Sequence, residues 1–362
     1  MEYTLSLSSF NTIILSSQPR RLTNKTSVSF SVPKRGRLVA VASAAGNHGG
    51  EFSSLNTPIE PVTPAGRFLS GVLLNEKKCF HDAVAETLEK LVKDVDDAFM
   101  RRALTSDSPD ALLHRRIAEL KEHECKTAVQ DVMYMLICYK FSDLNVHLIP
   151  RLSKCIYNNR LEVLPSKDWE LESIHNFEIL EMIRNHLTSV IGWRSDFSVT
   201  DNWATTKINR RDLCQIYTSS ILFGYFLKSA ALRHKLEMSL VDPVDDMIFK
   251  QFRRKNLVFG GTYNPISTSQ FDGKKKREKL SSYLMGFAPE SLVKCAQPNS
   301  KEALNLIAKH SFALFGDMES DEVISTSFAT LKRFVLEAVA FGSFLWDTEE
   351  YVKTVYTLEE IN

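Results

Sequence analysis

Two short apolar stretches, FGYFL at Phe223–Leu227 and FGSFL at Phe341–Leu345, repeat one pattern at a spacing of 118 residues. Each lies in a longer apolar segment that is typical of a buried helix. A glycine inside such a helix costs about 1 kcal/mol relative to alanine, so it needs a compensating reason. Close packing of two helices is one such reason, and a ligand that approaches the backbone is another. We favour packing and predict that Gly224 and Gly342 are structural.

A second matched pair lies upstream, at Leu180–His186 (LEMIRNH) and Leu304–His310 (LNLIAKH), with a spacing of 124 residues. The good N-cap residues Asn176 and Ser300 keep this spacing, so the predicted helix starts match as well as the apolar faces. The change of spacing from 124 to 118 predicts a loop that is six residues longer in the first copy. The sequence therefore predicts a degenerate tandem duplication, in which each copy is a helix, a loop and a longer apolar helix.

The matched histidines His186 and His310 are candidates for a site, because an imidazole can bind a metal or accept a proton near neutral pH. Each one also follows a core isoleucine, Ile183 or Ile307, by about one turn on the apolar face of its helix. A buried histidine that hydrogen-bonds a backbone group fits this position better. We predict a structural role for both.

Before the repeats, the sequence predicts an antiparallel helical hairpin. Apolar residues recur at spacings of four and three: Val84, Leu88, Leu91, Val95 and Ala98. This stripe predicts an amphipathic helix over about 79–104. Ser108 and Pro109 supply the N-cap and the first-turn proline of a second helix, which extends to about Tyr139. Because the stripe spans barely three heptads, packing within the chain is favoured over a coiled coil.

These features predict an all-α fold, with a helical hairpin region followed by two degenerate tandem helical repeats. The first copy carries an insertion at about 145–175, where 161–164 and 169–171 could form one short β-hairpin. A stretch rich in Gly, Ser, Thr and Pro separates the copies. The predicted parts are a first helical domain at 67–245, a linker at 246–277 and a second helical domain at 278–360, which repeats 176–240.

The first 43 residues have the composition of a chloroplast transit peptide. They contain nine Ser, four Thr and six Lys or Arg, but only one acid. Val39–Ala42 fits a stromal processing site, and the small, polar, Pro-containing residues 44–66 predict a disordered linker. A mitochondrial presequence and a disordered Ser-rich tail are the alternatives. The hydroxyl-rich, weakly helical start favours the chloroplast stroma.

Charge and composition argue against two classes of protein. Removing the six basic residues and the one acid of the leader changes the formal net charge from +1 to −4. A mildly acidic mature chain does not support a globally basic nucleic-acid binder. No apolar run approaches the roughly 20 residues that a transmembrane helix needs.

The sequence predicts no cofactor, no metal and no catalytic residue. Its six cysteines form neither a C-x-x-C pair nor a zinc spacing, and we expect most of them to be buried thiols. His123, Glu124 and Cys125 are metal-ligand types, but adjacent residues of a helix point in different directions and cannot converge on one ion. Phosphate-binding loops and short catalytic signatures are absent as well.

The sharpest charged feature is basic. Seven cations flank the Gly- and Ser-rich part of the predicted linker: Arg253, Arg254, Lys255, Lys274, Lys275, Lys276 and Arg277. They could bind the phosphates of a nucleic acid or of an anionic lipid surface. Because the mature chain is acidic, a solvated linker is favoured over both kinds of partner.

Three further segments carry a family resemblance: Thr127–Phe141 (TAVQDVMYMLICYKF), Ile208–Asp212 (INRRD) and Phe223–Lys228 (FGYFLK). With them the chain resembles the chloroplast UV-B-induced proteins of plants, a family built on a plastid domain of unknown function. The resemblance covers nearly all of the chain after the leader. It implies a chloroplast address and a link to UV-B or light stress, and it implies no activity, cofactor or catalytic residue.

These observations favour a stromal protein that is not an enzyme and that binds a protein partner under UV-B or light stress. An enzyme with a polar pocket between the repeats is one alternative, because a helical enzyme needs no short motif. A binder of nucleic acid or of anionic membrane surfaces through the basic linker is the other.

Overall fold

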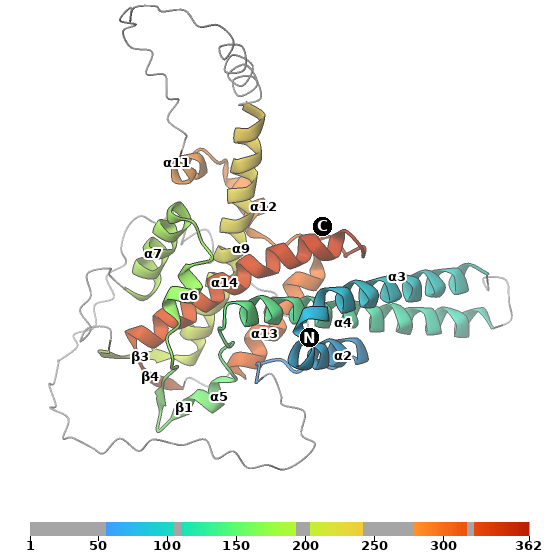
Figure 1. Ribbon diagram of the computed structural model, residues 1–362, viewed down its shortest axis with the longest axis horizontal. Coiled ribbons are helices and arrows are strands. Elements are labelled where there is room, and N and C mark those ends of the chain that lie inside the picture. The colour runs from blue at the N-terminus through green and yellow to red at the C-terminus, as the bar shows by residue number, and fades with distance from the viewer. Residues whose placement is uncertain (1–55, 105–109, 193–202, 242–278, 317–321, 362) are drawn as a thin grey trace, which may run out of the picture. The chain divides into compact units, whose positions relative to one another are not determined.

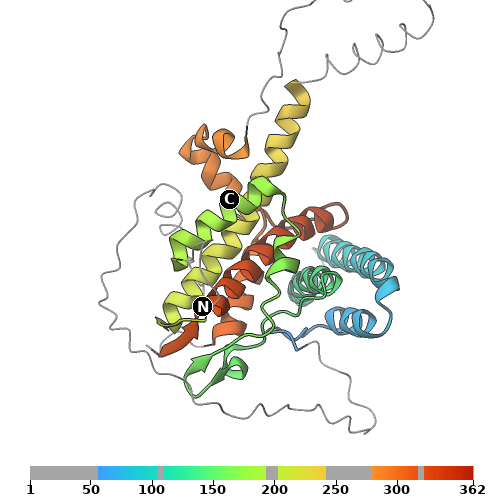
Figure 2. The same ribbon diagram turned by 60° about the vertical axis from the view of Figure 1, so that its left-hand side comes forward.

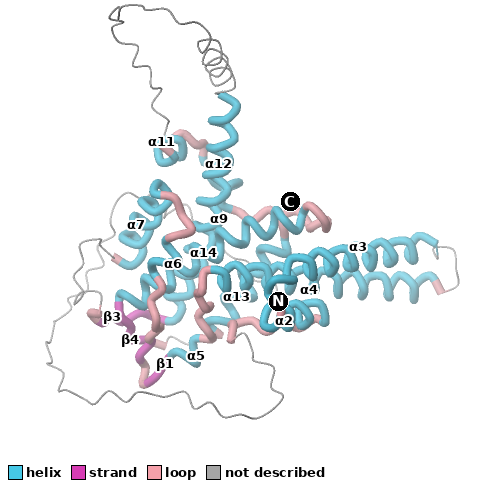
Figure 3. Tube along the Cα trace, viewed as in Figure 1, coloured by secondary structure: helices cyan, strands magenta, loops and turns pink. Residues whose placement is uncertain are grey.

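The computed structural model describes residues 56–104, 110–192, 203–241, 279–316 and 322–361. Residues from Asn56 onward form one compact unit, so the two predicted helical domains share one core. The described residues are mostly helical, but they also contain a small four-stranded sheet (Figure 3). The all-α prediction is therefore wrong in this respect.

The first described helix, α2 (Pro64–Asn75), packs on the helical hairpin and is capped by the side chain of Thr63. The buried carboxylate of Asp131 accepts three hydrogen bonds at the start of this helix. They come from the Thr63 hydroxyl at 2.7 Å, the Thr63 amide at 2.8 Å and the Val62 amide at 3.0 Å. Residues 56–66 were expected to be disordered, and the structure corrects this, because their N–H groups find a buried acceptor.

Replacing Asp131 with alanine removes the acceptor of these three hydrogen bonds. We expect the variant to lose about 3 kcal/mol of unfolding free energy, because a buried carboxylate makes charge-assisted bonds. Residues 56–66 should also become a site of rapid proteolytic cleavage. Urea unfolding and limited proteolysis measure the two effects, with the exposed acid Asp96 replaced by alanine as the control. Equal protease resistance in both variants would contradict this view of the N-terminal segment.

The predicted hairpin is present as α3 (Phe80–Leu104) and α4 (Ala111–Asp143), entered through a 3₁₀ turn at Lys77–Cys79. Ser108 and Pro109 lie outside the described residues. Residues 128–138 of α4 are all buried, because α2, α3, α13 and α14 pack around this half of the helix. The other half of α4 accompanies α3 to a free end, which lies away from the other described helices (Figure 1). Figure 2 gives a second view, in which the hairpin is foreshortened.

The insertion after α4 contains two short helices and a β-hairpin. The elements are α5 (Leu152–Cys155), β1 (Ile156–Tyr157), β2 (Arg160–Leu161) and α6 (Asp168–Glu172). Asn158 and Asn159 join β1 to β2 with positive φ angles of 52° and 57°, as a two-residue type I′ turn requires. The sequence predicted a short hairpin in this insertion, but on later residues. Trp169, which was assigned to its second strand, lies in α6.

Two segments with the same order of elements follow. The first comprises α7 (Phe177–Ile191), β3 (Thr205–Asn209) and α9 (Arg210–Val241). The second comprises α13 (Lys301–Phe315), β4 (Val323–Ser327) and α14 (Phe328–Lys353), and the short helices α11 (Leu280–Met285) and α12 (Pro289–Ala296) precede it. Asn176 and Ser300 cap α7 and α13 with their side chains, as the sequence predicts.

The sheet connects the insertion to both segments. Its strand order is β1-β2-β4-β3, with β2 parallel to β4 and β3 antiparallel to β4. Lys207 pairs with Ser325, and these two residues are also matched at the spacing of 118. Lys207 and Ser325 are the central residues of β3 and β4. The antiparallel pair is therefore arranged with approximate two-fold symmetry about its centre.

The long helices α9 and α14 lie side by side in Figures 1 and 2 and meet at the two glycines. A Cβ atom built on Gly224 would lie 2.0 Å from the carbonyl oxygen of Val339. One built on Gly342 would lie 1.9 Å from the carbonyl oxygen of Ile221. Ile221 and Val339 are themselves matched at the spacing of 118, so the contact is reciprocal. Any side chain at either glycine would push the two backbones apart.

Candidate functional site

Four polar side chains from three helices meet in the core between the two segments. Tyr217 of α9 lies with its hydroxyl 3.0 Å from Nε2 of His310 in α13 and donates a hydrogen bond to Glu337 of α14 at 3.2 Å. Arg333, one turn before Glu337 in α14, forms an ion pair with it at 2.9 Å. The four side chains, called the core network below, are all buried, and none exposes more than 2% of its surface.

The core network also fixes the segment that leaves α4. The amide of Ile149 donates to both carboxylate oxygens of Glu337 at 3.1 Å, and Nη2 of Arg333 donates to the carbonyl of His147 at 2.9 Å. Each charged member is thus bonded both to its partner and to backbone. These bonds compensate part of the cost of removing the charges from water, but Nε and Nη1 of Arg333 have no acceptor among the described residues.

The pKa values of the core network make its members poorly suited to acid–base catalysis at neutral pH. Burial lowers the pKa of His310 to about 3 and raises the pKa of Tyr217 well above its usual value. Burial also raises the pKa of Glu337, although the charge of Arg333 opposes this shift. At neutral pH the imidazole is therefore neutral and a weak proton acceptor, and the phenol keeps its proton. Together with the lack of solvent access, these states favour a structural role.

His186 occupies a similar place in the first segment. Its Nε2 lies 3.0 Å from the hydroxyl of Ser220, and its ring stacks on Phe223 with centroids 4.3 Å apart. His310 stacks on Phe341 at the same centroid separation of 4.3 Å. Both histidines are buried, but each bonds a side-chain hydroxyl, not the backbone group that the sequence suggested.

The two histidines should make the fold sensitive to acid. Burial lowers the pKa of His186 to about 4 and of His310 to about 3, whereas the ordinary value is 6.5. Between these values the unfolded chain binds protons that the folded chain does not bind. The stability is therefore complete above about pH 6.5 and is lost as the pH falls toward the folded pKa values. Each histidine should lower the free energy of unfolding by about 2 kcal/mol when the pH falls from 7.5 to 5.0.

Urea unfolding at these two pH values tests that expectation. The His186→Gln variant isolates the contribution of His186 to this pH dependence, because it removes one titrating group and keeps the core network. Its loss of unfolding free energy between the two pH values should be smaller than that of the wild type by about 2 kcal/mol. Equal losses in the two proteins would show that His186 is not held neutral in the fold.

Another buried carboxylate, Glu349 of α14, joins α9 to the start of α13 and was not predicted. The hydroxyl of Tyr225 donates to it at 2.6 Å, and the hydroxyl of Ser300 donates to its other oxygen. Burial and the neighbouring charge of Glu349 raise the pKa of Tyr225. The same phenol accepts a hydrogen bond from the amide of Asn299 at 3.2 Å. No sequence motif predicts this cluster, because its members are far apart in the chain.

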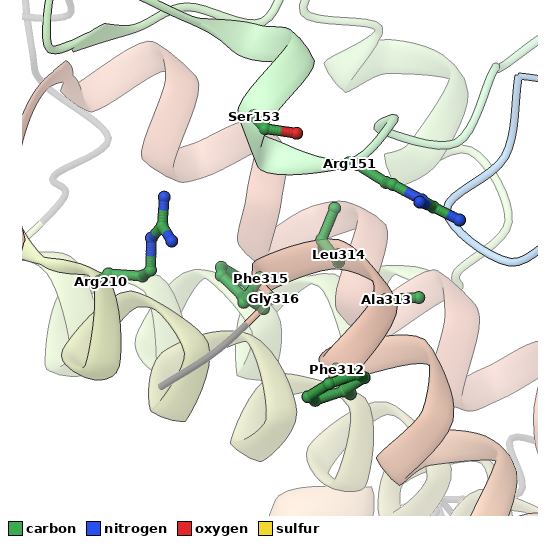
Figure 4. A pocket seen from close by; sticks show the side chains of 8 residues that line it. All are labelled: Arg151, Ser153, Arg210, Phe312, Ala313, Leu314, Phe315 and Gly316. Carbon is green, nitrogen blue, oxygen red and sulfur yellow. The ribbon is translucent and has the colours of Figure 1, made fainter. Parts of the chain in front are cut away.

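A pocket of about 400 Å³ lies where α13 ends (Figure 4). It is lined by Arg151, Ser153, Arg210, Phe312, Ala313, Leu314, Phe315 and Gly316. Both arginines already have partners: Arg210 pairs with Glu322 at 2.7 Å, and Arg151 donates to the carbonyl of Pro58 at 3.2 Å. Its described lining holds no acid, histidine or thiol, and therefore no pair for acid–base catalysis.

The free end of the hairpin exposes large apolar side chains, and the sequence analysis missed this feature. They are Phe99, Met100, Leu112, Leu113, Ile117 and Leu120, called the hairpin end below. The exposed fraction is 67% for Phe99, 83% for Leu112 and 59% for Leu113. Leu113, Ile117 and Leu120 recur at spacings of four and three, so the signal was present as a second apolar stripe on α4.

The sequence is similar to a known protein family and to a named plant protein. A family model described as "Protein of unknown function (DUF760)" matches residues 112–240. A chloroplastic UV-B-induced protein of Arabidopsis thaliana is 34% identical over 352 residues, which cover 89% of this chain and 83% of that protein. The chain belongs to the family of chloroplast UV-B-induced proteins. No solved structure matches it.

The segments that resemble the UV-B-induced family lie mainly in the framework. Most of Thr127–Phe141 forms the buried half of α4, Ile208–Asp212 joins β3 to α9, and Phe223–Lys228 contains the crossing of α9 and α14. The family model spans α4 to α9 and so includes Tyr217, whereas the other three members of the core network lie beyond it. These three segments therefore contribute to the framework more than to a chemical site.

The remaining candidate residues are placed as follows. The seven basic residues at 253–255 and 274–277 lie outside the described residues. Among the residues that are described, no cluster of His, Cys, Asp or Glu could hold a metal ion, and no helix is long and apolar enough to cross a membrane. All six cysteines are free thiols, four of them buried, with Cys155 partly exposed and Cys79 exposed.

Proposed function

We propose that this chain is a non-catalytic protein of the chloroplast stroma that binds a protein partner in the response to UV-B or light stress. The partner contacts the hairpin end. The name of the Arabidopsis relative and the composition of the leader support the chloroplast address. The same name supports the link to UV-B.

The exposed apolar surface of the hairpin end carries this proposal. Large apolar patches on a folded protein mark interaction sites more often than chance exposure. The alternative, an enzyme with a pocket between the segments, has weaker support. The titratable groups between α9, α13 and α14 are buried where a substrate does not reach, and the pocket in Figure 4 is lined by none of them.

We also propose that the two helix–strand–helix segments are copies of one ancestral unit, related by an approximate two-fold axis. Three reciprocal features support this. Lys207 pairs with its match Ser325, the glycines of α9 and α14 contact each other's matched neighbours, and each histidine stacks on the matched phenylalanine. An isologous interface has this property, because each contact occurs twice.

Affinity purification from chloroplasts, with and without UV-B treatment, tests the proposed function. The bait is the chain without its leader, residues 44–362, compared with a variant carrying Leu113→Glu and Ile117→Glu. A matched control carries Trp169→Glu and Met285→Glu, which change two exposed apolar residues elsewhere (81% and 88% exposed). We expect one partner to be lost from the hairpin-end variant and retained by the control. Equal recovery with all three baits would overturn the proposal.

A further inference from the structure

The hairpin end has the charge pattern of a surface that pairs with itself. We infer that it binds the hairpin end of a second copy of this chain, so that two hairpins lie side by side in opposite directions. This inference rests on the proposed function, since it names the partner that covers the exposed apolar residues.

Charge changes sign along the hairpin on the two sides of Phe99, Met100, Ile117 and Leu120, whereas Leu112 and Leu113 lie beyond the arginines of α4, nearer the free end. Basic residues lie toward its free end: Arg101, Arg102, Arg115 and Arg116. Acidic residues lie one to three turns further from that end: Asp94, Asp96, Asp97, Glu122 and Glu124. Lys93, Lys121 and Lys126 lie among these acids, which outnumber them. Exposed pairs within the hairpin join Glu119 to Arg115 at 3.1 Å and to Arg116 at 3.6 Å. Others join Lys121 to Asp94 at 3.1 Å and Arg102 to Glu122 at 3.5 Å. Exposed pairs of this kind are weak and can be exchanged at little cost.

This pattern selects the direction of pairing. When two hairpins overlap in opposite directions, the basic end of each lies over the acidic stretch of the other, and Phe99, Met100, Ile117 and Leu120 meet in the middle. When they overlap in the same direction, arginine faces arginine. The opposite arrangement is two-fold symmetric, so each favourable contact forms twice. It also gives the usual anatomy of an interface, an apolar centre within a charged rim.

The stripe of Leu113, Ile117 and Leu120 supplies the apolar seam. Spacings of four and three are those with which antiparallel helices interdigitate in bundles. Asp131 lies on the same face of α4, about five helical turns after Leu113, and there it binds the segment before α2. Among the described residues, this face of α4 is therefore covered near the core and uncovered at the free end.

Analytical ultracentrifugation of residues 44–362 over a range of concentrations measures the pairing directly. We expect a dimer that dissociates on dilution and weakens as salt increases. Leu113→Glu with Ile117→Glu should weaken dimerisation at least about 100-fold, because it places four charges in the seam of the dimer. Trp169→Glu with Met285→Glu should leave it unchanged. Circular dichroism confirms that each variant is folded.

A charge-reversal experiment tests the direction of pairing. One variant carries Asp96→Lys and Asp97→Lys, and the other carries Arg115→Glu and Arg116→Glu. Each alone brings like charges together and should be monomeric, whereas a mixture of the two restores opposite charges at both ends and should form a heterodimer. Failure of the mixture to associate, while wild type dimerises, would overturn the antiparallel arrangement.

The proposed function and the self-association fail in different ways. A wild-type chain that stays monomeric up to about 100 μM, well above the range of specific protein complexes, overturns the second copy as partner. If the hairpin-end variant still loses a chloroplast protein in that case, the proposed function stands with another partner. If the chain dimerises equally with and without the Leu113→Glu and Ile117→Glu changes, the inference fails even though a dimer exists.

Discussion

Gly342→Ala is expected to cost about 3 kcal/mol or more of unfolding free energy, or to prevent folding. The new methyl group would lie 1.9 Å from the carbonyl oxygen of Ile221 and 2.8 Å from the amide nitrogen of Tyr225. Both are backbone atoms of α9, so no side-chain rotation can relieve the clash. Helices α9 and α14 would have to separate, and overpacking a tight core costs up to about 3 kcal/mol. Chemical denaturation measures the change.

Gly71→Ala provides the matched control, because it makes the same substitution in another helix. A Cβ atom at Gly71 would meet nothing within 4 Å. Alanine is favoured over glycine in a helix by about 1 kcal/mol, so this variant should be as stable as wild type or slightly more stable. Gly224→Ala should resemble Gly342→Ala, since its Cβ would lie 2.0 Å from the carbonyl oxygen of Val339. Two stable proteins from these crossing variants would refute the close approach of the helices.

Arg333→Met is the second substitution for which we expect a large loss. It removes the only charged partner that the structure shows for the buried carboxylate of Glu337. Breaking one side of a buried ion pair costs about 3–5 kcal/mol, because the remaining charge stays out of water. The expected result is a loss in this range in urea unfolding at pH 7.5.

The adjacent residue Lys332 gives the control for this change. Lys332 pairs with Asp168 at 2.9 Å and Glu172 at 3.1 Å, and its side chain is 13% exposed. Lys332→Met alters the net charge equally but should cost less than Arg333→Met, because its partners Asp168 and Glu172 keep 27% and 20% of their side-chain surface in water, whereas Glu337 keeps none. A double variant, Arg333→Met with Glu337→Gln, should recover part of the loss because no unpaired charge remains. Additive losses for Arg333→Met and Glu337→Gln would contradict the coupling of the two residues.

Much of the helical framework could be predicted from local patterns. The stripe from Val84 to Ala98 predicted α3, and the side-chain caps Asn176 and Ser300 marked the starts of α7 and α13. The strands could not be predicted in this way. β3 and β4 are five residues each and partly polar, and they are stabilised by pairing with one another across the chain. Such pairing is a tertiary property that no local window contains.

The polar sites show the same limit. His186 and His310 could be singled out, because the matched segments repeat them at a fixed spacing. Their hydroxyl partners Ser220 and Tyr217 could not, since the matching positions of the other copy hold Ala338 and Val335. The hairpin end differs, because the second stripe on α4 was visible in the sequence. A helix pattern alone does not show which of two apolar faces the chain itself will cover.

The central claim is that the hairpin end binds protein, and site-specific photocrosslinking tests it most directly. Benzoylphenylalanine would replace Leu113 in one bait and the more exposed Met285 in another, and each would be irradiated alone and in chloroplast stroma. We predict a discrete protein adduct from position 113 and none from position 285; for the purified chain, the adduct should have twice the mass of one copy. No adduct from position 113 in either setting, or the same adducts from both positions, would contradict the claim.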